Sequence, residues 1–108
     1  MDREKQQKAP FVEALEGYCQ QHMKAYHTPG HKLGQGISAY QANLFGDALR
    51  RDLGVMYALD DLFQPEGALK GAMELAADLY GAGRTFFSIN GTTACIEAMI
   101  LAVCGDGD

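Results

Sequence analysis

The stretch from Thr85 to Cys104 constrains the fold of this 108-residue chain more than any other. A short apolar, β-prone run, Thr85 to Ile89, meets the turn sequence Asn-Gly-Thr-Thr at residues 90–93. A strongly apolar, helix-prone run follows at once and ends on Cys104, with Gly105 behind it. The pattern predicts a strand, a tight turn and a helix, an arrangement typical of α/β proteins.

The predicted turn has the chemistry of an anion site. Gly91 tolerates a positive φ and lets a ligand approach the backbone closely. Free N–H groups and the positive end of the helix dipole favour an anion there, and the hydroxyls of Thr92 and Thr93 can donate to phosphate oxygens. Ordinary N-capping explains the same residues at least as simply. Dinucleotide and P-loop sites are disfavoured, because neither glycine motif is present.

Composition and charge exclude several classes of protein. The hydrophobic content of 47% is that of a globular protein, with no run long enough to cross a membrane and no secretory signal. The net charge is −5 and no Lys/Arg stripe is present, which argues against nucleic acid as a partner. Because Cys19, Cys95 and Cys104 lack metal-ligand spacing, we expect no metal and three reduced thiols in a cytoplasmic protein.

Apolar periodicity and glycine positions predict five further segments. The first two are an amphipathic helix over Phe11 to Met23, in which His22 is partly exposed, and an irregular loop over 26–36. A short helix over Gln41 to Leu53, with Leu44 and Phe45 inward, comes next and is followed by a short strand or extended segment over Val55 to Leu59. The last is an amphipathic helix over Ala68 to Tyr80, closed by Gly81. A single convincing strand cannot satisfy its own ladder groups. We therefore expect the N-terminal piece of a larger enzyme subunit.

Two polar clusters lie outside the predicted turn. The segment His27 to Lys32 places two histidines and a lysine in a glycine-rich loop, which is either site-lining or simply exposed. Asp60 and Asp61 form either a carboxylate pair for acid–base chemistry or, more simply, a turn or helix cap. Cys95 lies near the start of the last helix and packs most simply as a small hydrophobe.

Several short motifs follow one another along the chain. They are His27-Thr28-Pro29-Gly30-His31-Lys32 with Gly34 and Gly36, Asp52, Leu59-Asp60-Asp61-Leu62 with Pro65 and Gly67, Leu75-Ala76-Ala77, Tyr80-Gly81-Ala82, Thr85-Phe86-Phe87 and Asn90-Gly91-Thr92-Thr93. In this order they resemble the N-terminal part of the Orn/Lys/Arg decarboxylase family, major domain, from about Tyr26 to the last residue. Each motif alone is weak, and their series is specific.

The resemblance implies a pyridoxal-phosphate (PLP) enzyme of fold type I that decarboxylates arginine, lysine or ornithine in polyamine or diamine formation. It implies an α/β fold: the incomplete start of an aspartate-aminotransferase-type large domain, mostly helical with one or two strands. Residues 1–25 are then a helical lead-in and 26–108 the start of the major domain. By the same resemblance Gly91, Thr92 and Thr93 contact the cofactor phosphate, and His31 and Lys32 are candidate site-lining residues.

The family also implies what this chain lacks. The Schiff-base lysine, the acid beside the pyridine nitrogen and the ring-stacking residue all follow the NGTT helix, beyond Asp108. Lys32 precedes the phosphate turn and does not match that lysine. We therefore expect no catalytic residue in this chain and no decarboxylation by the chain alone.

Other interpretations stay open at this point. The alternatives to a decarboxylase fragment are a fragment of another fold-type-I enzyme, such as an aminotransferase-like relative, and a non-catalytic truncated remnant. The residues do not decide which basic amino acid is the substrate. The family implies a homodimer or higher homo-oligomer for the complete protein, with sites at dimer interfaces.

Overall fold

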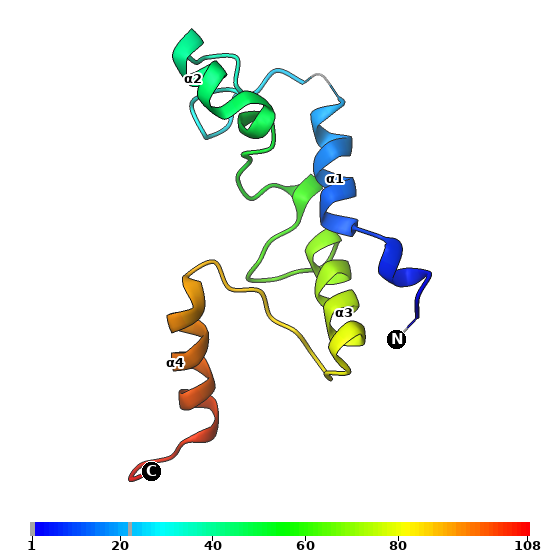
Figure 1. Cartoon of the computed structure of the whole chain (residues 1–108), viewed down its shortest axis with the longest axis vertical. Coiled ribbons are helices and arrows are strands. Elements are labelled where there is room, and N and C mark those ends of the chain that lie inside the picture. The colour runs from blue at the N-terminus through cyan, green and yellow to red at the C-terminus, as the bar shows by residue number, and fades with distance from the viewer. Residues whose placement is uncertain (1, 22) are drawn as a thin grey trace.

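The computed structural model describes residues 2–21 and 23–108, and Figure 1 shows their arrangement. Within these residues the regular elements are all helical. In chain order they are the 3-10 helix η1 (Lys5–Gln7), α1 (Pro10–Cys19), α2 (Ala39–Phe45), the 3-10 helices η2 (Gly46–Arg50) and η3 (Tyr57–Leu59), α3 (Ala68–Tyr80) and α4 (Gly91–Val103). The prediction that His22 is a partly exposed helix residue lies outside the described residues.

The core lies where α1 packs against α3 and η3. Five side chains from these three elements are buried: Tyr18, Cys19, Leu59, Met73 and Ala77. The apolar stripes of the two amphipathic helices face each other, which is how such helices remove apolar surface from water. This core is small for 108 residues and joins only α1, η3 and α3.

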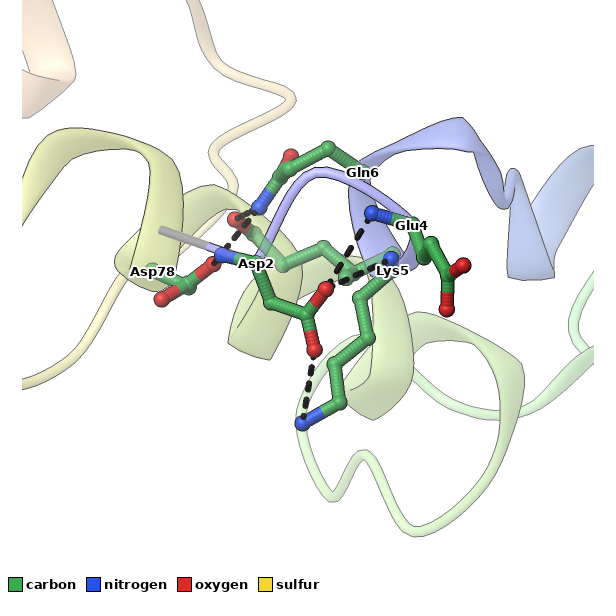
Figure 2. Close-up of polar contacts among 6 residues, drawn as sticks. Asp2, Glu4, Lys5, Gln6 and Asp78 are labelled. Carbon is green, nitrogen blue, oxygen red and sulfur yellow. Dashed lines mark hydrogen bonds and ion pairs between the residues drawn. The ribbon is translucent and has the colours of Figure 1, made fainter.

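The N-terminal segment is attached to α3 by hydrogen bonds rather than by apolar packing (Figure 2). The backbone N–H of Asp2 and the side-chain amide of Gln6 both donate to the carboxylate of Asp78, each at 3.0 Å. The Gln6 amide also donates to the Leu75 carbonyl at 2.9 Å. The donated hydrogen bonds lower the pKa of Asp78, that of the Asp2 N–H most of all. The polar lead-in is therefore an ordered part of the fold.

Helix α3 ends at the predicted residue because its C-terminus is specified locally. Gly81 adopts φ +65° just after the helix, and its N–H and that of Ala82 donate back to the last-turn carbonyls. The Ala82 N–H reaches the Ala77 carbonyl at 2.9 Å, which completes a Schellman motif. Glycine suits this position because a Cβ is strained in the left-handed region.

The first two predicted helices are shorter than expected. Helix α1 ends at Cys19, four residues before the predicted end. The helix predicted over Gln41 to Leu53 is wrong as a single element, because Gly46 at φ +51° divides it into α2 and η2. Leu44 and Phe45 are 62% and 49% exposed, so their predicted inward orientation is wrong as well. Among the described residues, α2 has a substantial contact only with η2, and this short element cannot cover the apolar face of α2.

The predicted strand over Thr85 to Ile89 is wrong in this structure. These residues lie in irregular chain, and Phe86 and Ile89 are both 78% exposed. Val55 to Leu59 is no strand either: it contains η3, and Met56 and Asp60 form an isolated antiparallel bridge. A strand exists only with a neighbour to share its ladder, and the described residues provide none. The expected one or two strands are therefore absent from the described part of the chain.

Helix α4 is set apart from the other helices (Figure 1). None of its residues is buried, although Glu97 is its one charged residue. The radius of gyration of the chain is 17.6 Å, whereas a compact domain of this length has about 13 Å. Helix α4 therefore extends away from the core instead of adding to it.

Candidate functional site

The N-terminus of α4 presents backbone N–H groups to open space. Gly91 begins the helix at φ +80°, and Asn90 precedes it without a side-chain capping bond. Gly91, Thr92 and Thr93 are all exposed, and a Cβ built on Gly91 would meet nothing within 4 Å. The first N–H groups of a helix have no carbonyl partner within the helix. This turn can therefore donate several hydrogen bonds to an anion.

Two of the other three α-helices, α2 and α3, are capped at their N-termini by side chains of the chain itself. In α1 the carboxylate of Glu13 accepts only the N–H of Ala9, which precedes the helix, at 2.9 Å. In α2 Ser38 and Gln41 form a reciprocal capping box. In α3 the carboxylate of Asp60 takes this place. The sequence left N-capping as an alternative for the NGTT turn, and the structure shows no side-chain cap there among the described residues.

In the second of the two polar clusters, the carboxylate of Asp60 accepts hydrogen bonds from backbone N–H groups. Its Oδ1 accepts the N–H of Asp61 and of Glu66, each at 2.9 Å. Its Oδ2 accepts the N–H of Gly67, Leu69 and Lys70 at 2.8, 2.9 and 3.3 Å. The interpretation of Asp60 as a turn and cap residue is confirmed.

The neighbouring Asp61 has a similar, smaller role. Its Oδ1 accepts the N–H of Phe63 at 2.8 Å. Backbone N–H groups of the same loop therefore donate to both carboxylates. The geometry does not support the hypothesis that this pair of carboxylates acts in acid–base catalysis.

The histidine loop, residues 27–36, is ordered by its own polar side chains. The Gly34 N–H donates to His31 Nδ1 at 3.2 Å, and His31 Nε2 lies 3.2 Å from Asp52 Oδ2. The Lys32 ammonium donates to the His27 carbonyl at 3.0 Å. Both candidate site-lining residues, His31 and Lys32, are thus half-buried and already hydrogen-bonded within the chain.

His27 extends this network to α1. Its Nδ1 donates to the carbonyl of Thr28 at 2.8 Å, so its Nε2 is free to accept from the hydroxyl of Tyr18 at 3.2 Å. Tyr18 is one of the buried residues of the core. The contacts of the histidines with Tyr18 and Asp52 were not predicted from the sequence, because separations of 9 and 21 residues correspond to no local pattern.

The two sequence-predicted site regions are not brought together by the described residues. Figure 1 shows the histidine loop beside α2 and the start of α4 well away from it. No hydrogen bond or ion pair within the described residues joins residues 27–36 to residues 90–93. An apolar groove of about 410 Å³ lies between α1, the segment after η2 and the chain before α4, with Leu15, Leu53, Phe87 and Ile89 among its lining residues.

Comparison with known proteins places these features in one family. The family described as Orn/Lys/Arg decarboxylase, major domain, matches residues 9–108. The chain belongs to this family. The resemblance inferred from the ordered motifs is therefore confirmed, and the match includes the histidine loop, the LDDL segment and the NGTT turn.

Named relatives in the Orn/Lys/Arg decarboxylase family are several times longer than this chain. An arginine decarboxylase of Bacillus anthracis is 42% identical over 109 residues, which cover 100% of this chain and 22% of that protein. An arginine decarboxylase of Bacillus subtilis (strain 168) is 40% identical over 95% of this chain and 21% of that protein. The inducible ornithine decarboxylase of Escherichia coli (strain K12) is 35% identical over 97% of this chain and 15% of that protein.

One further comparison and two structural observations complete the description of the chain. No solved structure matches the chain. Among the described residues, every helix is too short or too polar to cross a membrane. The three cysteines are all free: Cys19 is buried, Cys95 half-buried and Cys104 exposed.

Proposed function

We propose that this chain is the N-terminal part of a PLP-dependent decarboxylase of a basic amino acid. The observation that carries the proposal is the family match over residues 9–108. The relatives described above as arginine decarboxylases share 40–42% identity with the chain, and the ornithine decarboxylase shares 35%. Arginine is therefore the substrate we favour, with ornithine and lysine as the alternatives.

We assign the cofactor phosphate to the N-terminus of α4. The donor set fits a phosphate: N–H groups of a first helical turn, two hydroxyls, a glycine at φ +80° and no competing side-chain cap in the described residues. An anion here is further stabilised by the helix dipole, by about 0.3–1 kcal/mol at an exposed site. Gly91, Thr92 and Thr93 would hold the phosphate.

PLP, when bound, supplies the electron-withdrawing ring that accepts the electron pair left by the departing carboxylate. The chain itself contributes binding and positioning. Gly91 allows close approach of the phosphate to the backbone, and Thr92 and Thr93 can donate their hydroxyl protons to its oxygens. We propose His31 and Lys32 as residues that line the site from the histidine loop in the assembled enzyme.

The remaining parts of the proposal concern the complete protein. We propose that the PLP-binding part of the major domain begins near residue 26, that the reactive lysine follows Asp108, and that the enzyme acts in the cytoplasm as a homodimer or higher homo-oligomer. Polyamine or diamine formation is the corresponding biological role. The 108-residue chain would then hold part of a phosphate site and release no CO₂ by itself.

The proposed activity is tested on the protein encoded by the complete gene that contains this sequence. The corresponding protein, supplied with PLP, is expected to release CO₂ from arginine faster than from ornithine or lysine. Release from none of the three amino acids would overturn the proposed function. Faster release from ornithine or lysine would overturn only the choice of arginine. The 108-residue chain assayed in parallel should release no CO₂, and release by this chain would contradict the placement of the reactive lysine.

The phosphate assignment has its own test in the same protein. Replacing both hydroxyls with the isosteric Thr92→Val and Thr93→Val changes is expected to weaken PLP binding, measured by absorbance titration. Ser88→Ala is the matched control, because that hydroxyl lies two residues before the turn and accepts only the Asn90 N–H at 3.2 Å. Equal PLP affinity in the double variant and the control would refute the assignment of the two hydroxyls.

A further inference from the structure

The two bonds of His31 determine where its ring proton resides. A backbone N–H can only donate, so His31 Nδ1 must accept from Gly34 and carries no proton in the neutral ring. The single ring proton is therefore on Nε2, which donates to Asp52 Oδ2 at 3.2 Å. The hydrogen-bond network thus assigns one tautomer, with both ring nitrogens occupied.

The backbone around His31 needs such support. Lys32, Leu33 and Gly34 have φ values of +52°, +57° and +81°, three consecutive residues in the left-handed region. Only Gly34 adopts this conformation without strain, and non-glycine residues there cost about 1–2 kcal/mol each. The turn is closed by the Gln35 N–H to the Lys32 carbonyl at 3.1 Å and the Gly36 N–H to the His31 carbonyl at 2.9 Å. The imidazole adds a third bond, to the N–H of Gly34.

Asp52 lies outside this loop and just after η2. The His31 side chain is 14% exposed and the Asp52 side chain 60%. The carboxylate therefore reaches from a solvated position to the edge of a mostly covered ring. It needs no desolvation to accept the Nε2 proton, which makes this a low-cost contact that sets the orientation of the ring.

We propose that Asp52 is a positioning residue that fixes the orientation of the His31 ring by accepting its Nε2 proton and so keeps the strained turn at Lys32 to Gly34 in place. With both nitrogens engaged, His31 offers no free nitrogen for proton transfer, and its role is to order the loop that also presents Lys32. Only the link from this loop to the substrate rests on the proposed function. The tautomer and its control by Asp52 follow from the chain alone.

The experiment is ¹⁵N NMR of the histidine rings in the 108-residue chain without cofactor. The unaltered chain is expected to show the Nε2–H pattern for His31, with Nδ1 as an acceptor and a downfield Gly34 amide. The His31→Gln change identifies the His31 signals. An Nδ1–H pattern, or a rapid average of the two tautomers, would overturn the proposal before any variant of Asp52 is made.

Two Asp52 variants test the control of the tautomer. Asp52→Ala is expected to leave the ring free to turn away from the Gly34 N–H, so that the two tautomers average and the Gly34 amide shifts upfield. Asp52→Asn keeps an oxygen acceptor and should retain the Nε2–H pattern, with a smaller downfield shift of that proton because the charge-assisted contact is lost. Asp47→Ala, on the neighbouring η2, is the matched control and should change neither signal. Unchanged His31 and Gly34 signals in Asp52→Ala, or an unchanged Nε2–H shift in Asp52→Asn, would refute the role of Asp52. The NMR experiment contains no PLP, so its result does not depend on whether the complete protein binds PLP as proposed.

Discussion

Replacing Asp60 with alanine removes a carboxylate that accepts five backbone N–H groups, at 2.8–3.3 Å. Loss of a helix cap costs about 0.5–2 kcal/mol, and each hydrogen bond to a charged group contributes about 1.5–3 kcal/mol. Water replaces part of this, because Glu66, Gly67 and Lys70 are exposed. We expect Asp60→Ala to lower the free energy of unfolding by about 2–3 kcal/mol.

The backbone of Asp60 separates the effect of the carboxylate from that of the chain conformation. Asp60 has φ +72° and ψ 177°, a region that is essentially restricted to glycine and costs about 1–3 kcal/mol for other residues. Asp60→Gly loses the same carboxylate but relieves this strain. The glycine variant should therefore be about 1 kcal/mol more stable than the alanine variant.

The pH dependence of Asp60 follows from the same contacts. Burial raises the pKa of this carboxyl, but the N–H groups of Glu66, Asp61 and Gly67 outweigh burial and hold the pKa well below its usual range. A lowered folded pKa means that the stabilisation is fully present above the unfolded pKa, about 3.9. It is lost progressively as the pH falls from there toward the folded pKa. Above about pH 5 the contribution of Asp60 should not vary with pH.

Urea unfolding of the 108-residue chain, followed by circular dichroism at pH 7, measures these differences. Amide exchange at Leu69 and Lys70, whose N–H groups lose their acceptor, reports the same change locally. Asp61→Ala is the matched control, because Asp61 accepts only the Phe63 N–H, and its loss should be about 1 kcal/mol or less. Equal destabilisation by Asp60→Ala and Asp61→Ala would refute the reasoning, as would a glycine variant less stable than the alanine variant.

Three further substitutions have expected outcomes. Gly81→Ala places a Cβ at φ +65° and should lower the thermal stability of the chain by about 1 kcal/mol, and an unchanged melting temperature would contradict the left-handed cap. Ser38→Ala removes the capping box of α2 and should weaken amide protection in α2 by about 1 kcal/mol, with no effect on α3. Thr93→Val should leave the stability of the 108-residue chain within about 0.5 kcal/mol and, in the complete PLP-loaded enzyme, weaken cofactor binding about tenfold by titration.

Local signals in the sequence were sufficient for α3 and for the start of α4. Gly81 ends α3 by its own conformation, and apolar periodicity specifies the face that carries the buried Met73. The division of α2 from η2 was harder to predict, because Gly46 can be accommodated in a helix at modest cost. Only its φ of +51° in the folded chain makes it a break.

The features that could not be predicted correctly depend on residues that are distant in the sequence. A strand at residues 85–89 requires a neighbour that the described residues do not contain, so β propensity alone predicted it wrongly. The pair His31 and Asp52 is 21 residues apart across an irregular loop, where neither helical nor strand periodicity applies. The family resemblance was accessible from the sequence because it depends on the order of short motifs and not on their contacts.

The exposed apolar surface of helix α4 bears on the proposed role of the chain. Its larger apolar side chains, Ile96, Met99, Ile100, Leu101 and Val103, are 46–81% exposed, although a helix that is apolar on all sides is normally interior. The chain exposes 8518 Å², whereas a compact monomer of 11.7 kDa exposes roughly 5,900 Å². The excess is larger than the roughly 1,600 Å² that a standard protein–protein interface buries. This excess is what we expect if α4 is enclosed within the larger domain of the proposed enzyme, with its N-terminus at the proposed phosphate site.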